Sequence, residues 1–291
     1  MANLARVLRE SKDVPGILTC KGIVRKVGIN GQPAEFQFIL EMPHHLGDTP
    51  TCLRSVLHRS AHEPPPREDR VLLARQIVNA VISVHNLHFV HKNMRPETIL
   101  IFPNPQNTLG VPFLVDFQMF RSAERITFSA DDSLWSKNIY RHPSRQGTYP
   151  DNVNRMQHDI YSLGVILLEI GLWSPFVDQN GQPGMALSQI VPILQDGDQS
   201  QGSSRIKKIL ITMAHSHLPP RMGAKYADTV AACLTCLDRE SELGSEIEFF
   251  EDDGTLVGVR YIQRVSQFRC TDTHLAQRLT PIIDFKSARR D

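Results

Sequence analysis

The chain has 291 residues, of which 41% are hydrophobic and 22% charged, so it carries enough apolar side chains to bury a sizeable core. Lys and Arg together number 32, and Asp and Glu number 31, which leaves a formal net charge of +1. This balance argues against a chain that binds nucleic acid or anionic membranes through its overall charge, and we expect neither partner.

Residues 1–42 predict a short helix followed by a small sheet. The segment 4–11 (LARVLRES) has a helical pattern, whereas 17–27 (ILTCKGIVRKV) and 35–42 (EFQFILEM) have the composition and alternation of strands. Asn-Gly between the two strands is a strong hairpin signal. The first residues contain no long apolar run, so we expect neither a signal peptide nor a membrane segment there.

The middle of the chain is predicted to be mainly helical. Apolar residues recur at steps of three and four over 69–88, as on one face of a long helix. The segment 159–173 (DIYSLGVILLEIGLW) is apolar nearly all round, which predicts a helix buried inside a helical region. Further helices are predicted over 51–60, 204–216 and 226–237.

Two short strands are predicted within this helical region, at 97–102 (ETILIF) and 112–117 (PFLVDF). The segment 103–111 (PNPQNTLGV) between them has the composition of a turn. Towards the C-terminus we expect an acidic surface passage at 241–254 and a terminal helix over 255–265.

The five cysteines are odd in number and scattered, which predicts a reducing compartment without a disulfide framework; we expect a cytoplasmic protein. Cys233 and Cys236 lie in an apolar helical pattern, so we interpret both as buried structural residues and not as a metal site. The paired histidines we interpret as ordinary surface or helix-end residues: His44 and His45, His85 and His88, His215 and His217.

Four motifs occur in the order and spacing that a eukaryotic protein kinase has. Residues 91–98 (HKNMRPET) match the catalytic loop, and 116–118 (DFQ) match the metal-binding turn. Residues 140–144 (YRHPS) match the end of the activation segment, and 158–164 (HDIYSLG) match the start of a central helix. Over about 17–237 the chain therefore resembles the protein kinase family. It is similar in particular to degenerate kinase-like domains of filamentous fungi that are associated with HeLo-type proteins.

The resemblance implies an α+β, protein-kinase-like fold with a truncated N-lobe and a mainly helical C-lobe. Residues 1–42 would form the residual N-lobe, comprising the end of the C-helix and two strands. Residues 43–237 would form the C-lobe, and 238–291 a C-terminal extension.

Several residues of the resembling catalytic loop differ from those that phosphoryl transfer uses. Asn93 replaces the aspartate that accepts or orients the hydroxyl proton of the substrate, and an amide has no useful basicity. Thr98 replaces the asparagine that holds a second Mg²⁺, and Arg95 replaces the lysine that reaches the transferred phosphate. Asp116 keeps one metal ligand, while Gln118 replaces the glycine of the metal-binding turn.

The nucleotide-binding half of the resembling fold is reduced further. No G-x-G-x-x-G precedes a strand, and no strand lysine of the V-A-I-K type is present. Glu41, Met42 and Pro43 match the hinge, where Pro43 stands at the position that donates a backbone N–H to adenine in kinases. Proline has no N–H to donate, so we expect no nucleotide there.

Three other residues match positions that hold the kinase core together. His91, Phe117 and Asp159 match the residues that connect the catalytic loop, the metal-binding turn and the buried helix in the family. The resemblance implies a structural role for all three. We expect a buried Asp159 to accept hydrogen bonds from backbone N–H groups of the catalytic loop.

These features predict a catalytically inactive pseudokinase that acts as a signalling or interaction module, with a protein partner and no cofactor. Two alternatives stay open. The chain could be a divergent ATP-dependent Ser/Thr kinase that uses Asp116 and Mg²⁺. It could also be a fragment of a longer kinase-like protein, whose preceding segment would supply the glycine-rich loop and the lysine.

Overall fold

The computed structural model describes residues 5–6, 8–9, 14–27, 33–87, 89–117, 134–146, 155–195 and 199–238. In this part of the chain the first sheet contains two antiparallel strands, β1 (Cys20–Val27) and β2 (Pro33–Leu40), as the sequence predicts for 17–42. The second sheet is antiparallel with the order β3–β4–β5, formed by Thr51–Cys52, Ile99–Asn104 and Asn107–Leu114.

The β4–β5 hairpin corrects one prediction, because most of the segment 103–111 is paired strand and not turn. The turn is confined to the junction of the two strands, where Asn104 Oδ1 accepts a hydrogen bond from the Gln106 N–H at 2.9 Å. Gly110 has a φ of +85°, and a Cβ there would lie 2.4 Å from the Phe102 carbonyl oxygen. This glycine therefore allows close pairing of the strands, a use that composition does not distinguish from a turn.

The predicted helices are present with small shifts at their ends. Helix α3 (Arg67–Asn86) and helix α5 (Met156–Leu172) confirm the two strongest predictions. Helices α2 (Leu53–Arg59), α7 (Gln199–His217) and α9 (Ala224–Thr235) were also expected. Three short helices complete this part, α4 (Trp135–Asn138), α6 (Val191–Gln195) and α8 (Pro219–Met222). Short 3₁₀ helices cover Pro96–Thr98, Pro143–Arg145 and Met185–Ile190.

Helix α5 is the centre of the helical part, because every one of its residues is buried. It packs against α3, α7, α8 and α9. A Cβ on Gly164 would lie 2.7 Å from the Cβ of Cys233, so this glycine lets α9 approach α5 closely. Cys233 and Cys236 are both buried, as the sequence predicts. Helix α9 is therefore packed closely against the middle of α5.

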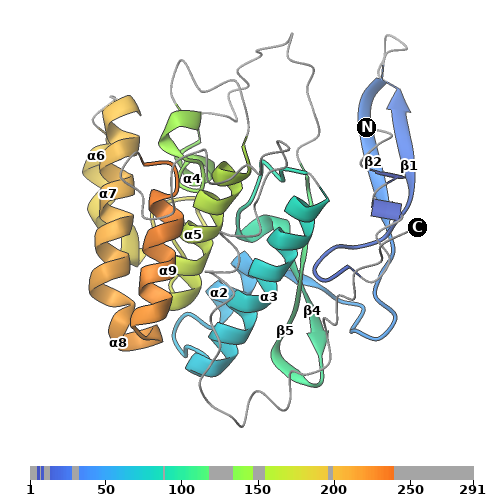
Figure 1. Cartoon of the computed structure of the whole chain (residues 1–291), viewed down its shortest axis with the longest axis horizontal. Helices are drawn as coiled ribbons and strands as arrows, with labels where there is room; N and C mark the ends of the chain where they lie inside the picture. The colour runs from blue at the N-terminus through green and yellow to red at the C-terminus, as the bar shows by residue number, and fades with distance from the viewer. Residues whose placement is uncertain are drawn as a thin grey trace, which may run out of the picture.

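The elements form a mainly helical part and a separate small hairpin, which confirms the predicted α+β class. Figure 1 shows α5, α7, α8 and α9 on one side, the β1–β2 hairpin on the opposite side, and α2, α3 and the β4–β5 hairpin between them. Among the described helices, none combines the length and the apolar character that a membrane span requires.

Some predictions concern residues that the structure does not describe. They are Gln118, His88, the acidic passage at 241–254 and the terminal helix over 255–265. Of the helix predicted over 4–11, residues 5, 6, 8 and 9 are described, and all four are helical. The division of the chain into 1–42, 43–237 and 238–291 stays a prediction.

Candidate functional site

The loop after α3 is fixed by a buried carboxylate. Asp159, in the first turn of α5, is 1% exposed and accepts hydrogen bonds from the backbone N–H groups of His91 at 2.6 Å and Lys92 at 2.9 Å. The contact expected of Asp159 is therefore present. Lys92 has a φ of 67°, a left-handed conformation that is uncommon outside glycine. The charge-assisted bonds to Asp159 help to hold the loop in this conformation.

His85 is a second partner of Asp159, which the sequence interpretation missed. Its Nε2 lies 3.2 Å from Asp159 Oδ2, and the residue is only 3% exposed. His85 lies at the end of α3, as expected, but inside the core instead of at the surface. The sequence contained a signal for this burial, because His85 follows Ile77 and Val81 at steps of four residues and so lies on the same buried face of the helix.

The same contacts set the pKa of Asp159. Burial alone would raise this pKa, but the hydrogen bonds from the His85 side chain and from the His91 backbone N–H lower it below the ordinary value. Asp159 is therefore held as a carboxylate. In this form it can accept several hydrogen bonds at once.

His91 connects the loop to the segment after β5. Its Nε2 lies 3.0 Å from the Val115 carbonyl oxygen and therefore donates to it, while its Nδ1 accepts the Asn93 N–H at 3.3 Å. The imidazole is packed against Phe117, with 4.5 Å between the ring centroids. Burial lowers the pKa of His91, although the carboxylates of Asp159 and Asp116 act in the opposite direction. His91 is thus a neutral structural residue.

Replacing His91 by glutamine should make stability less dependent on pH. The folded protein keeps this histidine neutral, while the unfolded chain takes up a proton below the ordinary pKa of 6.5. The stability from His91 is therefore present above pH 6.5 and is lost as the pH falls below it. Between pH 7 and 5 the parent should therefore lose more unfolding free energy than His91→Gln.

Urea denaturation at pH 7, 6 and 5 measures this difference. The exposed His215 of α7 provides the control, since His215→Gln should leave the pH dependence of the parent unchanged. Equal slopes for the parent and His91→Gln would show that His91 is not held neutral by the fold.

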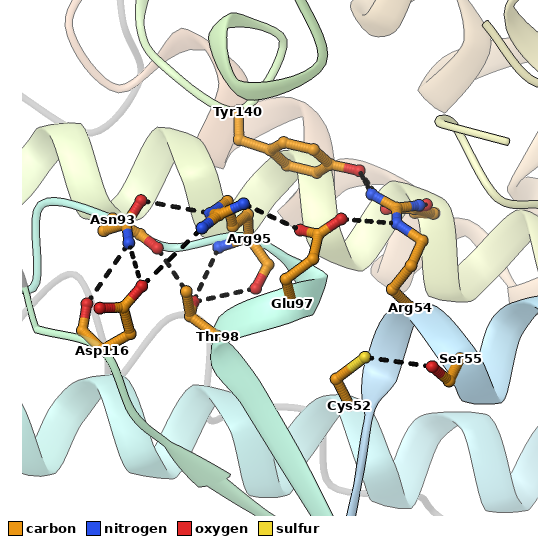
Figure 2. Close-up of polar contacts among 10 residues, drawn as sticks. Cys52, Arg54, Ser55, Asn93, Arg95, Glu97, Thr98, Asp116 and Tyr140 are labelled. Carbon is orange, nitrogen blue, oxygen red and sulfur yellow. Dashed lines mark hydrogen bonds and ion pairs between the residues drawn. The ribbon is translucent and has the colours of Figure 1, made fainter. Parts of the chain in front are cut away.

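Asn93, Arg95 and Asp116 form a cluster at the exposed end of this loop, and their side chains point toward one another (Figure 2). Asn93 Nδ2 donates a hydrogen bond to Asp116 Oδ2 at 2.8 Å. Arg95 donates from Nε to Asn93 Oδ1 at 3.3 Å, and its Nη2 lies 3.8 Å from Asp116 Oδ2. Asp116 has a φ of 60° and ends the extended segment after β5. The carboxylate of Asp116 thus already has an amide and a cation as partners.

Thr98 does not contribute a ligand to this cluster. It is 1% exposed, and its hydroxyl accepts the Arg95 backbone N–H at 3.2 Å. The hydroxyl also donates a shared hydrogen bond to two carbonyl oxygens, that of Asn93 at 2.9 Å and that of Arg95 at 3.0 Å. These contacts close the 3₁₀ turn Pro96–Thr98, so Thr98 has a local structural role.

The donor set does not fit a divalent cation. Mg²⁺ requires several oxygen ligands, usually including carboxylates and phosphates. Here Asp116 is the single carboxylate, Asn93 presents its amide nitrogen to it, and Arg95 brings a positive charge. Within the described residues no group of three or more His, Cys, Asp and Glu side chains could hold a metal ion.

The residues that match the hinge join β2 to β3. The Glu41 N–H donates to the Thr19 carbonyl oxygen at 2.8 Å, and the Glu41 carboxylate lies 2.8 Å from Lys21 Nζ. The hydrogen bond from Lys21 lowers the pKa of Glu41. Met42 is 43% exposed, and the Pro43 carbonyl oxygen accepts the Leu46 N–H at 3.1 Å.

A buried cluster around Arg54 lies next to the loop and was not predicted. Arg54 Nε donates to Glu97 Oε1 at 2.9 Å, and Nη1 donates to the Glu169 carboxylate. Arg54 Nη2 donates to the Tyr140 hydroxyl at 2.5 Å, which in turn donates to Glu169 Oε2 at 2.7 Å. Burial alone would lower the pKa of Arg54, but Glu169 raises it well above its ordinary range. The guanidinium therefore stays charged and joins α2, the 3₁₀ turn and α5.

The amino-acid sequence of the chain is similar to those of known kinases and kinase-like proteins. The chain is 29% identical over 149 residues to a serine/threonine-protein kinase-like protein of Arabidopsis thaliana, covering 50% of this chain and 40% of that protein. It is 26% identical over 187 residues to an SNF-related serine/threonine-protein kinase of Rattus norvegicus, covering 63% of this chain and 20% of that protein. These similarities support a protein-kinase-like domain.

A further relative is the eukaryotic translation initiation factor 2-alpha kinase 1 of Rattus norvegicus, which is 34% identical over 115 residues. That match covers 35% of this chain and 17% of the relative. The kinase-like chain thus spans 40% or less of the length of these three proteins. No family model matches it. The predicted likeness to fungal domains of HeLo-associated proteins stays a prediction.

Proposed function

We propose that the kinase-like domain is a pseudokinase that acts as a signalling or protein-interaction module and does not transfer phosphate. The arrangement of Asn93, Arg95 and Asp116 carries this proposal. Asn93 stands at the position of the catalytic base and donates a hydrogen bond to the carboxylate that would hold the metal ion. An amide cannot accept the proton of a substrate hydroxyl, and a metal ion at Asp116 Oδ2 would have to compete with Asn93 and with the positive charge of Arg95.

The nucleotide-binding side supports the same proposal. Phosphoryl transfer depends on positioning and charge neutralisation, and Arg95 and Thr98 stand where the kinase family has the lysine that reaches the transferred phosphate and the asparagine that holds a second Mg²⁺. Pro43 has no N–H to donate to an adenine ring. We therefore propose that the domain uses neither ATP nor Mg²⁺ as a cofactor, and that it binds a protein in the cytoplasm.

One observation favours a divergent Ser/Thr kinase as the second candidate. Asp116 is retained, and its side chain is 62% exposed, so a ligand could reach it. The relatives named as kinases also favour this candidate. It requires ATP and Mg²⁺ to displace the contacts of Asp116 with Asn93 and Arg95.

ATP with Mg²⁺ should leave the melting temperature of the protein unchanged. A ligand that binds only the folded state raises the melting temperature, and the rise grows as the ligand concentration exceeds its Kd; the proposed pseudokinase has no site for this ligand. The measurement is a thermal melt of the parent and of Asp116→Asn across a range of ATP concentrations with Mg²⁺. A rise that is already present at sub-millimolar ATP in the parent and is lost in Asp116→Asn would favour the divergent kinase.

A further inference from the structure

Arg95 has fixed contacts on both of its sides, although it lies beside an exposed carboxylate. Its side chain is 21% exposed, whereas that of Asp116 is 62% exposed. On the inner side Arg95 Nη1 lies 3.8 Å from Glu97 Oε2. Its backbone N–H donates to Thr98, and its Nε donates to Asn93. The guanidinium is thus positioned by the loop and is not a mobile surface group.

The contacts of Arg95 continue inward as a row of alternating charges. Glu97 contacts Arg95 through Oε2 and Arg54 through Oε1, as Figure 2 shows. Arg54 is held in turn by Glu169, which is completely buried. From the surface to the core, the row is Asp116, Arg95, Glu97, Arg54 and Glu169. Each cation lies between two carboxylates, which favours the position that Arg95 occupies.

We propose that the Arg95 guanidinium is a built-in counter-cation of Asp116 and that this charge excludes a divalent cation from the retained carboxylate. Arg95 and Asn93 both approach the same oxygen, Oδ2 of Asp116. A divalent cation on this oxygen would lie within a few ångströms of the guanidinium and would be repelled by it. The proposal rests on the pseudokinase function and adds a cause to it. In kinases the loop lysine at this position reaches the transferred phosphate, whereas the Arg95 guanidinium lies 3.8 Å from Asp116 Oδ2 itself and keeps metal away from it.

The test measures binding of Mn²⁺ alone, by electron paramagnetic resonance of the unbound ion, to the folded full chain. The parent should bind only at millimolar Mn²⁺ or above. Arg95→Gln keeps a polar side chain but removes the charge, and it should bind Mn²⁺ at least tenfold more tightly. Arg95→Lys keeps a positive charge and should remain like the parent. The double variant Arg95→Gln with Asp116→Asn should lose this increase in affinity for Mn²⁺.

Two further variants keep the test decisive. Arg95→Met is a second neutral replacement that keeps the packing of the aliphatic stem, and it serves if Arg95→Gln does not fold. Arg59→Gln changes an exposed arginine on α2 and should bind Mn²⁺ as the parent does. The proposal is overturned if the neutral variants fold but bind Mn²⁺ no more tightly than the parent. It is also overturned if the affinity of Arg95→Lys for Mn²⁺ increases as much as that of Arg95→Gln. A melting-temperature rise of the parent with ATP and Mg²⁺ would instead overturn the proposed function.

Discussion

Replacing Arg54 by methionine should lower the free energy of unfolding by about 3–5 kcal/mol, because it leaves a buried carboxylate without its cation. Glu169 is completely buried, and its remaining partners are the Tyr140 hydroxyl and the Phe176 N–H at 2.7 Å. Urea denaturation measures the loss. Methionine is similar in length to arginine up to the guanidinium, so most of the effect should come from the lost charge.

Two variants separate this explanation from a general loss of packing on α2. Arg59→Met changes an exposed residue of the same helix and should alter the unfolding free energy by no more than about 0.5 kcal/mol. Arg54→Met combined with Glu169→Gln removes both charges but keeps an oxygen for the Phe176 N–H, so it should be more stable than Arg54→Met alone. Equal stability of Arg54→Met and Arg59→Met would contradict the role of the buried ion pair.

Replacing Asp159 by asparagine should destabilise the protein by about 2–4 kcal/mol. Asparagine has one acceptor oxygen, so it cannot serve both backbone N–H groups of His91 and Lys92 together with His85. Hydrogen exchange should show faster opening of the loop than of the rest of the chain. Asp228→Asn, on the exposed face of α9, is the matched control and should have little effect.

The effect of Asp159→Asn should also depend on pH in a defined direction. The pKa of Asp159 is lowered from its ordinary value of 3.8, so its contribution is present above this pH and is lost as the pH falls through the lower pKa of the folded state. The stability difference between the parent and Asp159→Asn should therefore shrink below pH 3.8. A difference that stays constant on acidification would mean that the carboxylate charge contributes little.

Local sequence patterns predicted the elements that carry their own periodicity. Helices α3 and α5 have clear apolar patterns, and the kinase-like spacing placed Asp159 opposite the catalytic loop. The predicted limits of the β4–β5 hairpin were wrong, because proline, asparagine and glycine also occur inside tightly paired strands. In such cases the partner strand determines the structure, and composition alone does not reveal it.

The Arg54 cluster could not be predicted from spacing, because its members come from four separate segments. Arg54 lies 43 residues from Glu97, 86 from Tyr140 and 115 from Glu169 along the chain. One signal was nevertheless present. Within the apolar run IYSLGVILLEIGLW, Glu169 is the single charged residue, and a charge in a buried helix requires a partner. The sequence predicted the need for a cation but not which arginine supplies it.

A phosphotransfer assay with radiolabelled ATP and Mg²⁺ tests the central claim most directly. It compares the parent, Asn93→Asp combined with Thr98→Asn, and the same double variant with Asp116→Asn. The double variant restores the base and the second metal ligand, but it keeps Arg95 in place of the loop lysine and Pro43 in place of the residue that donates an N–H to adenine. We expect no transfer above background from any of the three. Transfer by the double variant that disappears with Asp116→Asn would contradict the account and identify a weakened kinase.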